Sequence, residues 1–384
     1  MQYGEAMRLL FWLSAGLLTY TQAAYALVLA LLARTGAARP VRARDPEPGT
    51  EPDVSLIVAA YREEAVIAAK VANALALDWP RERFELVVAV DGGGEPGADG
   101  TAARARAAGA DVVLELPRGG KMRSQDAAVR AARGSLLAFS DANAMWEPGA
   151  LRELAAAFAD PEVAYACGQV TFVNDAGTNQ EGLYWRYEMA IRARESALAS
   201  VTGGNGAIYA VRREDYLEPD VPMGHDLFMP FSQVKRGRRA VYVPAARATE
   251  KMVPTVEGEW ARKRRMMTQA WPIVLRGGLA DLRGYPARYA WMVVSHRLLR
   301  YASPVLHVLA LVASLALSRR RLYRAAALAQ LALAGAALAG GRVRSRPLLV
   351  ARYYVLTTAS LAAGLHDHLR HGTPQGWEPA EGTR

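Results

Sequence analysis

Residues 136–144 read LLAFSDANA, so an apolar run leads directly into Asp141 and Asn143. Two oxygen-bearing side chains, separated by one residue at the end of a strand, are typical of a site that holds a divalent cation and a diphosphate. The same step also occurs as a helix cap or a turn, because Asp and Asn bond nearby backbone N–H groups. The segments around this stretch have to distinguish the two interpretations.

Short apolar runs alternate with longer helix-like segments around this stretch. The strand-like runs are residues 54–59, 84–90, 111–116 and 136–139. Strands that alternate with helices of about ten or more residues predict an α/β fold with a doubly wound, mostly parallel sheet. Ligands bind such sheets at the carboxyl ends of the strands.

Acidic side chains follow three of these runs. Glu63 and Glu64 come after the first run, Asp91 precedes three glycines after the second, and Asp141 with Asn143 ends a later one. Because the carboxyl ends of parallel strands meet at one edge of the sheet, we expect these acidic sites to converge on a single crevice.

The composition indicates a membrane-associated protein with anionic partners. The 384 residues are 52% hydrophobic with a net charge of +10, and only five of the 47 basic residues are Lys. The arginines gather at the ends of apolar segments, and no nucleic-acid-binding module is recognisable, so we expect lipid headgroups and a diphosphate as partners and no nucleic acid. The single cysteine, Cys167, excludes an intramolecular disulfide and a Cys-cluster zinc site.

The N-terminal segment predicts a transmembrane helix within residues 1–38. Residues 9–33 are 25 residues without a charge, and a helix of that length spans roughly 37 Å, enough to cross a bilayer. The run is too long for a signal peptide, and no basic segment precedes it. Four arginines between residues 34 and 44 then place the following chain in the cytoplasm. We expect a linker in residues 39–53 and a cytoplasmic α/β domain in residues 54–284.

The chain becomes apolar again in residues 285–366. Residues 289–299 are aromatic and include two basic side chains, which favours an interfacial helix. Residues 301–318 and 325–341 predict a hairpin of two short spans, and residues 347–365 are a third candidate span. If the α/β domain is cytoplasmic, the Arg-rich tip of this hairpin lies on the opposite side of the membrane, against the tendency of basic residues to stay in the cytoplasm. Either the interfacial helix inserts more deeply into the membrane, or the local fold overrides that tendency. Residues 367–384 form a polar tail.

Seven motifs follow one another between Val54 and Trp271. They read AAYREE (59–64), VVAVDGGG (87–94), RGGKMRSQDAAVRAARG (118–134), FSDAN (139–143), GGNGAIYAVRRE (203–214), GHDLF (224–228) and RKRRMMTQAW (262–271). Weaker matches continue through SHRLLRYASP (295–304) to GWEP (376–379). Their order resembles the membrane-bound inverting glycosyltransferases of family 2, which have the Rossmann-like GT-A nucleotide-sugar fold.

The resemblance implies a donor site at the strand ends. It assigns Glu63, Asp91 and Lys121 to donor binding, with Asp91 on the nucleobase and Lys121 near the diphosphate at a helix start. Asp141 and Asn143 match the family's Asp-x-Asp, whose oxygens hold Mg²⁺ or Mn²⁺ on the donor phosphates. The second carboxylate is an amide here, so Asp141 is the firmer metal ligand.

The resemblance also implies an acceptor site and a general base. Asp226 stands where the family has a carboxylate that takes the proton of the acceptor hydroxyl. Gly204 and Asn205 belong to a glycine loop suited to close approach by an acceptor. His225 is a secondary acceptor-binding candidate, because a lone His is more often a hydrogen-bonded structural residue.

The basic run from Arg262 occupies the place of the family's Gln-x-x-Arg-Trp. Arg262 and Arg265 share a helix face and are expected to stabilise the departing nucleoside diphosphate. The alternative is a basic helix on anionic lipid, and both roles are compatible. The missing Gln and Trp argue against processive polymerisation, although Trp271 is a candidate substitute for the Trp.

These features predict a membrane-bound inverting glycosyltransferase. It would transfer a sugar from a nucleotide diphosphate sugar, with a UDP-sugar as first candidate, to a lipid-linked or saccharide acceptor delivered at the membrane. The alternatives are a processive polysaccharide synthase and an inactive nucleotide-sugar-binding membrane protein. We expect a multi-pass protein of the bacterial cytoplasmic membrane, with the catalytic domain facing the cytoplasm.

Overall fold

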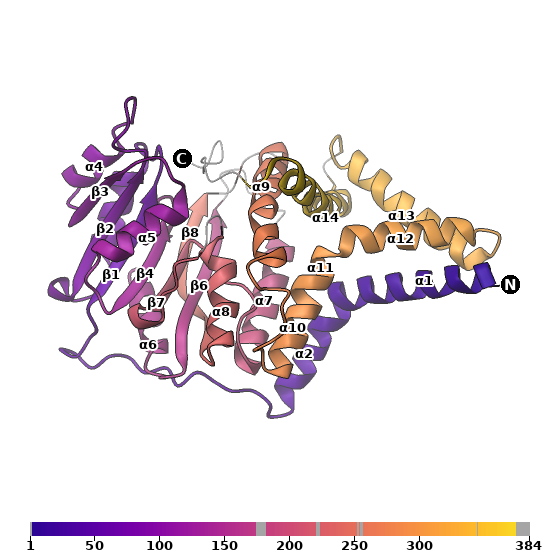
Figure 1. The fold of residues 1–384 in the computed structure, drawn as a ribbon, viewed down its shortest axis with the longest axis horizontal. Coiled ribbons are helices and arrows are strands. Elements are labelled where there is room, and N and C mark those ends of the chain that lie inside the picture. The colour runs from indigo at the N-terminus through magenta and orange to yellow at the C-terminus, as the bar shows by residue number, and fades with distance from the viewer. Residues whose placement is uncertain are drawn as a thin grey trace.

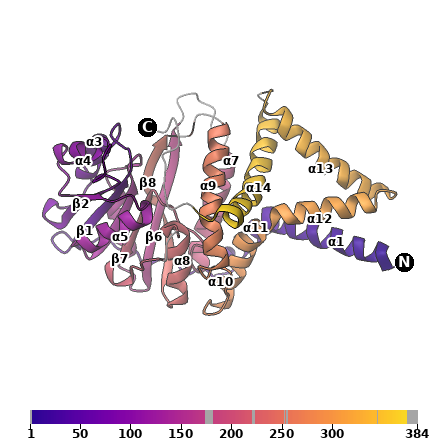
Figure 2. The same cartoon turned by 45° about the horizontal axis from the view of Figure 1, so that its top comes forward.

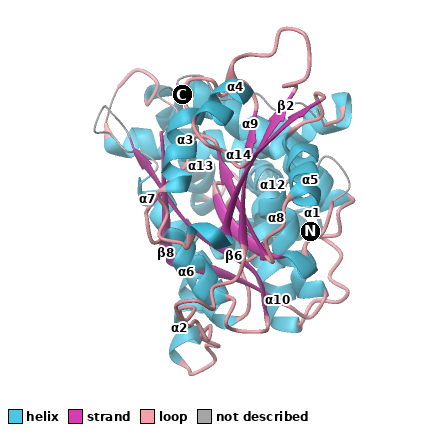
Figure 3. Cartoon of the chain, turned by 90° about the vertical axis from the view of Figure 1, so that its left-hand side faces the viewer, coloured by secondary structure: helices cyan, strands magenta, loops and turns pink. Residues whose placement is uncertain are grey.

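The computed structural model describes residues 2–173, 182–219, 223–251, 253, 256–343 and 345–373. An α/β part holds a twisted sheet with helices on both sides, and a helical arm extends from it (Figures 1 and 3). The α-helices of the α/β part are α3 (Ile67–Leu75), α4 (Thr101–Ala107), α5 (Lys121–Ala131), α6 (Ala150–Ala157), α7 (Gly182–Leu198), α8 (His225–Lys235) and α9 (Val256–Leu275). The 3₁₀ turns η2 (Arg81–Arg83) and η3 (Arg213–Asp215) complete the set.

Within the described residues, one eight-stranded sheet forms the centre of the α/β part, with the strand order β3-β2-β1-β4-β7-β6-β8-β5. The strands are β1 (Val54–Ala60), β2 (Phe84–Asp91), β3 (Val112–Leu116), β4 (Leu136–Asp141), β5 (Met145–Trp146), β6 (Val163–Val173), β7 (Ile208–Arg212) and β8 (Arg239–Lys251). The four strands predicted from the sequence are confirmed and pair in parallel. The sheet as a whole is mixed, because β7 pairs antiparallel with both β4 and β6.

The strands β1, β2 and β4 are buried on both faces, which explains their mostly apolar sequences. In β1, Leu56 and Val58 pack into one core cluster, while Ile57 packs into the cluster on the other face. The register pairs Ala59 of β1 with Asp141 of β4. The carboxyl ends of β1, β2 and β4 therefore meet at one edge of the sheet, as the strand pattern predicts.

The helical arm is built from both ends of the chain. The N-terminal helix runs through α1 (Gln2–Thr19), the π-helical turn η1 (Tyr20–Ala24) and α2 (Tyr25–Arg34). After the α/β part come α10 (Ala287–Met292), η4 (Val293–Leu298), α11 (Leu299–Tyr301), α12 (Ser303–Ala316), α13 (Arg321–Ala339) and α14 (Arg346–His371). Within the helical arm, α1 lies along α12 (Figures 1 and 2). α13 contacts both α12 and α14, and α14 packs against α9 of the α/β part.

Three of the described helices are long and apolar enough to cross a membrane: the N-terminal helix, α13 and α14. A fourth candidate is the pair of helical segments 287–301 and 303–316, which together are bent by 64° at the break between them. Large apolar side chains are exposed on the arm, among them Leu9 on α1 and Leu338 on α13. This exposure fits lipid contact and makes membrane association plausible.

α14 continues to His371, so the first residues of the predicted polar tail are helical. Within the predicted interfacial helix, Met292 is buried against Tyr25 and Leu29 of α2 and against α7. The predicted domain bounds stay predictions. The GWEP motif at residues 376–379 lies outside the described residues.

Candidate active site

Lys121 and Asp141 form an ion pair at the carboxyl edge of the sheet. Asp141 is the last residue of β4, and Lys121 is the first residue of α5, directly after Gly120, which has a positive φ of 89°. Burial tends to lower the pKa of Lys121, but the carboxylates of Asp141, Asp226 and Glu250 outweigh it and raise that pKa above its ordinary value. The ammonium group therefore stays charged at neutral pH.

Asp91 fixes the loop that delivers Lys121. Its Oδ1 accepts hydrogen bonds from the backbone N–H groups of Gly119 at 2.7 Å and Gly120 at 3.0 Å. Its Oδ2 pairs with Arg118 Nη1 at 2.9 Å. The Asp91 carboxylate is thus engaged by the loop, and its predicted contact with a nucleobase stays a prediction.

A cavity of about 150 Å³ opens beside Asp91. The Arg118 guanidinium lies 3.2 Å from the centroid of the Tyr61 ring, so two flat groups stack in its wall. Arg62, also in the wall, has a left-handed backbone with φ 53°, a conformation that non-glycine residues rarely adopt. Glu63 follows it, with a buried side chain and a backbone N–H that donates to Thr101 Oγ1 at 2.9 Å.

The glycine loop at residues 203–206 brings Asp226 to this edge. Gly204 N–H donates to the Asp226 carbonyl at 2.5 Å. A Cβ added to Gly206 would lie 3.7 Å from Lys121 Nζ and 4.0 Å from Asp226 Cβ. The loop therefore lies between the Lys121–Asp141 pair and Asp226, and the predicted donor and acceptor residues share one site.

Asp226 and Asn205 offer polar atoms at this loop. Asp226 lies in the first turn of α8, where its Oδ1 accepts the N–H of Leu227 at 3.0 Å. Asn205 Oδ1 accepts the N–H of Ala207 at 3.3 Å, and its buried Nδ2 has no hydrogen-bond acceptor in the described part of the chain. Both side chains can therefore bind a hydroxyl-bearing acceptor.

His225 lies in the core beneath Asp226. Its Nδ1 lies 3.0 Å from Tyr209 Oη and its Nε2 lies 3.3 Å from Tyr216 Oη, and only 2% of the residue is exposed. Both ring nitrogens are thus engaged by core tyrosines. This arrangement favours the structural interpretation of His225 over the acceptor-binding one.

The cations of α9 make contacts of their own. Arg262 forms a two-pronged ion pair with Glu259, at 2.8 and 2.9 Å, and Lys263 lies 3.2 Å from the same carboxylate. Arg264 pairs with Asp367 of α14 at 2.6 Å. Arg262 and Lys263 therefore form ion pairs within α9, and Arg264 links α9 to α14. The predicted action of Arg262 and Arg265 on the leaving diphosphate stays a prediction.

Trp271 does not replace the family's acceptor-site Trp. It is buried between α9 and α14, where its Nε1 donates to the Leu361 carbonyl at 2.9 Å. Its role is to pack two helices together.

Two residues near the site escaped the sequence analysis. Lys70 of α3 is fully buried and donates from Nζ to the Ala144 carbonyl at 2.6 Å, just beyond Asn143. Burial lowers its pKa to about 7, against the pull of Asp141 and Glu250. Glu250 lies in β8, beyond the point where the pairing of β8 with β6 shifts register. This position depends on long-range strand pairing, which no local sequence motif predicts.

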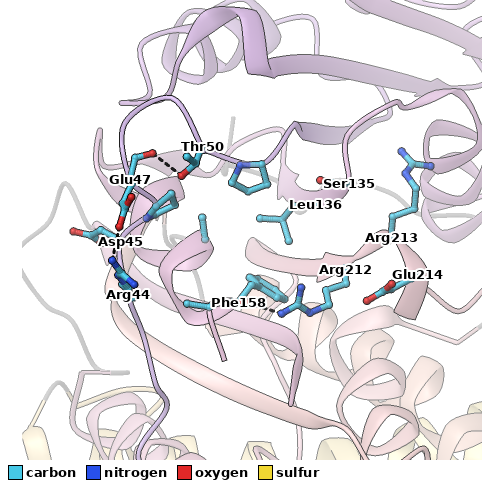
Figure 4. A pocket seen from close by; sticks show the side chains of 14 residues that line it. Arg44, Asp45, Glu47, Thr50, Ser135, Leu136, Phe158, Arg212, Arg213 and Glu214 are labelled. Atoms are coloured by element: carbon cyan, nitrogen blue, oxygen red, sulfur yellow. Dashed lines mark hydrogen bonds and ion pairs between the residues drawn. The ribbon is translucent and has the colours of Figure 1, made fainter. Parts of the chain in front are cut away.

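A larger cavity, of about 760 Å³, lies at the opposite edge of the sheet (Figure 4). Leu136, the first residue of β4, lines it, whereas Asp141 ends that strand. The linker with Arg44 and Glu47 covers one side, and Arg212 on the other side donates to the Phe158 and Val163 carbonyls. This cavity lies between the linker and the α/β part. The candidate active site is instead the carboxyl edge of the sheet, where Asp91 and Asp141 lie.

Comparisons with known proteins show the family and the fold. The family model described as "Glycosyltransferase like family 2" matches residues 52–269. Among solved structures, the chain is similar to the mannosyltransferase PcManGT from Pyrobaculum calidifontis in complex with GDP-Man and Mn²⁺, with a TM-score of 0.71 and 23% identity over 94% of this chain and 99% of that chain. Because the likeness spans nearly the whole chain, it confirms the GT-A fold with apolar helices at both termini.

A weaker likeness is to glucosyl-3-phosphoglycerate synthase from Mycobacterium tuberculosis in complex with Mn²⁺, UDP and glucosyl-3-phosphoglycerate. It has a TM-score of 0.41 and 19% identity over 57% of this chain and 79% of that chain. No curated protein matches the chain.

Proposed function

Because the chain belongs to the glycosyltransferase-like family 2, we propose that it is a membrane-bound inverting enzyme. It transfers a sugar from a nucleotide diphosphate sugar to a lipid-linked or membrane-delivered acceptor. The observation that carries the proposal is the convergence of the Lys121–Asp141 pair and Asp226 on the 203–206 loop. A cation and a carboxylate for the donor then lie next to a carboxylate for the acceptor.

The residues at the donor side fit a divalent cation. Asp141 is a half-buried carboxylate, and Asn143 adds an amide oxygen two residues later. Mg²⁺ and Mn²⁺ are commonly held by one or two such oxygens together with substrate phosphates. When bound, the ion would neutralise charge on the leaving diphosphate. Lys121 would share that task, because it stands beside Asp141 and remains protonated.

Asp226 is the proposed general base. An inverting transfer breaks the bond between the anomeric carbon and the diphosphate while the acceptor oxygen forms a new bond on the opposite face of the sugar. Oδ1 of Asp226 accepts the N–H of Leu227, which orients the carboxylate. Its Oδ2 accepts no hydrogen bond in the part of the chain that the structure describes, and we propose that this oxygen takes the proton of the acceptor hydroxyl.

The cavity beside Asp91 is the proposed nucleobase pocket. The stacked Tyr61 and Arg118 give it a flat wall, and Asp91 shapes the adjoining loop. PcManGT is described in complex with GDP-Man. We therefore include GDP-mannose beside UDP-glucose and UDP-N-acetylglucosamine as candidate donors.

Donor binding is tested with the purified full-length protein in detergent. Its melting temperature is measured with each nucleotide sugar, with and without Mn²⁺, because a ligand that binds the native state raises that temperature. We expect one donor to stabilise the protein in a Mn²⁺-dependent way, and Asp141→Ala to abolish the dependence on Mn²⁺. An unchanged metal response in that variant would remove Asp141 from the metal site.

Catalysis is tested with Asp226→Asn. We expect sugar transfer to fall at least about a hundredfold while donor binding is retained, because the amide does not accept the proton. Asp281→Asn is the control, since Asp281 is a carboxylate in the loop after α9, paired with Arg283. Near-normal transfer by Asp226→Asn would refute the assignment of the base. Product length separates single transfer from processive synthesis.

A further inference from the structure

A π-helical turn interrupts the helix that joins the α/β part to the arm. η4 lies between α10 and α11, and the π-helical turn η1 of the N-terminal helix packs against it. Thr21 Oγ1 donates to the Ser295 carbonyl at 2.8 Å, and Tyr20 Oη lies 2.8 Å from Ser295 Oγ. π-helical turns are rare and occur frequently at functional sites. This one carries Arg297.

Arg297 reaches the glycine loop of the active site. Its Nε donates to Thr202 Oγ1 at 3.0 Å. A Cβ added to Gly203 would lie 2.2 Å from Arg297 Nη2 and 2.8 Å from Cζ, so the guanidinium fills the space that a side chain at position 203 would need. The next residue, Gly204, is bonded to the Asp226 backbone. Arg297 therefore contacts Thr202 and Gly203, and the next residue, Gly204, contacts the backbone of Asp226, the proposed general base.

The neighbouring carboxylates are engaged by other groups. Glu195 accepts hydrogen bonds from Tyr25 at 2.6 Å and from the Thr202 hydroxyl at 3.0 Å, and it lies 2.8 Å from His296 Nδ1. Glu188 pairs with Arg300 and with His296 Nε2. Among the described residues, no carboxylate oxygen lies within 4 Å of the Arg297 guanidinium.

A second guanidinium approaches the same loop from α7. Arg192 Nη2 donates to the Gly204 carbonyl at 2.8 Å. Like Arg297, it is half-buried and has no carboxylate within 4 Å in the described part of the chain. Arg300, on the same segment as Arg297, differs in that it pairs directly with Glu188. Two half-buried guanidinium groups therefore lie beside one loop without a directly paired carboxylate, and a bound anion would stabilise both.

We propose that Arg297 and Arg192 bind an oxyanion of the acceptor, such as the phosphate of a lipid headgroup, and hold it beside Asp226. This inference rests on the proposed function, whose acceptor it specifies as anionic. The planar guanidinium forms paired, charge-assisted hydrogen bonds with phosphate and carboxylate groups. Arg297 lies on η4, which leads into the helical arm with the candidate membrane-spanning helices, so a membrane-delivered molecule is the acceptor that we expect it to bind.

The probe is decyl phosphate mixed into detergent micelles with the full-length protein. The melting temperature is followed as its mole fraction rises, with decanol as the uncharged control and inorganic phosphate as the soluble control. We expect decyl phosphate to stabilise the wild-type protein and decanol to have no effect. Arg297→Gln should raise the half-saturating mole fraction about tenfold or more.

Two further variants separate recognition from general charge and from misfolding. Arg320→Gln removes an exposed charge at the hairpin tip and should leave the titration unchanged. Gly203→Ala keeps Arg297 but displaces its guanidinium, because the new Cβ meets it at 2.2 Å. It should weaken the response as Arg297→Gln does, while the Mn²⁺-dependent response to the donor persists in both variants.

The outcomes distinguish the sources of the anion. A response to decyl phosphate alone supports a lipid headgroup, and an equal, Arg297-dependent response to inorganic phosphate supports a soluble oxyanion. Equal losses in Arg297→Gln and Arg320→Gln, or no loss in Arg297→Gln, would overturn the proposal. Absence of any donor response in the wild-type protein would instead contradict the proposed function, and the decyl phosphate titration would still test the anion site.

Discussion

Replacing Lys70 with Met is expected to change stability in opposite directions at neutral and at alkaline pH. Lys70 is fully buried beneath the loop that follows Asp141, and burial lowers its pKa from 10.5 to about 7. Met has a similar length and no charge. The substitution therefore relieves the burial of an ammonium group, but it also removes the hydrogen bond to the Ala144 carbonyl.

The magnitude follows from proton linkage. Between pH 7 and about 10 the unfolded chain holds a proton on Lys70 that the folded chain releases, so the stability of the wild-type protein rises with pH in this window. The slope is about 1.4 kcal/mol per pH unit. At pH 7 the charge burial costs about 4 kcal/mol, against about 1–3 kcal/mol for the lost hydrogen bond. Lys70→Met is thus stabilising at pH 7.

At pH 10 the order reverses. The linkage cost of Lys70 falls below about 1 kcal/mol, so loss of the hydrogen bond dominates and the variant is the less stable protein. The assay is chemical denaturation of both proteins in detergent micelles at several pH values between 7 and 10. Parallel pH profiles for the two proteins would refute the reasoning, because only Lys70 differs between them.

The same substitution tests whether Lys70 supports the active site. Ala144 follows Asn143 in the proposed metal loop, and losing its Lys70 contact should loosen that loop. We expect weaker donor binding in a variant that is more stable at pH 7, a trade-off typical of functional sites. Unchanged donor binding would confine the role of Lys70 to the core.

Two further variants test the supports of the site and of the arm. Asp91→Ala removes the acceptor of the Gly119 and Gly120 N–H groups, so donor affinity should fall about tenfold or more in the melting-temperature titration, and unchanged affinity would contradict the loop's role. Trp271→Phe loses the hydrogen bond to the Leu361 carbonyl and some packing, which should cost about 1–3 kcal/mol and lower the melting temperature. Trp12→Phe on the exposed face of α1 is its control and should change little.

Local patterns predict the parallel half of the sheet and the loops after it. The residues of β1, β2 and β4 are mostly apolar because both faces are buried, and this signal needs no knowledge of the strands they pair with. The place of the antiparallel β7 between β4 and β6 depends on pairing over about seventy residues, which no local signal encodes.

Side-chain environments were harder to predict than strands. His225 and Asp226 are adjacent in the sequence, yet one lies in the core between two tyrosines and the other lies beside the glycine loop, because helix α8 begins at that point. Arg262 is different, since its partner Glu259 is three residues earlier on the same helix. That spacing is a signal for an ion pair and could have been read from the sequence.

The helical arm carries the candidate membrane-spanning helices and also contacts the loop of the proposed active site. A chain of contacts leads from Tyr25 in α2 through Glu195 and Thr202 to Arg297, which fills the space beside Gly203. The first and last links join elements that are far apart in the sequence, so they form only when α2 docks on α7 and η4 docks beside the glycine loop. The position of the glycine loop thus depends on helix docking, and the catalytic edge is complete only when both ends of the chain have assembled against it.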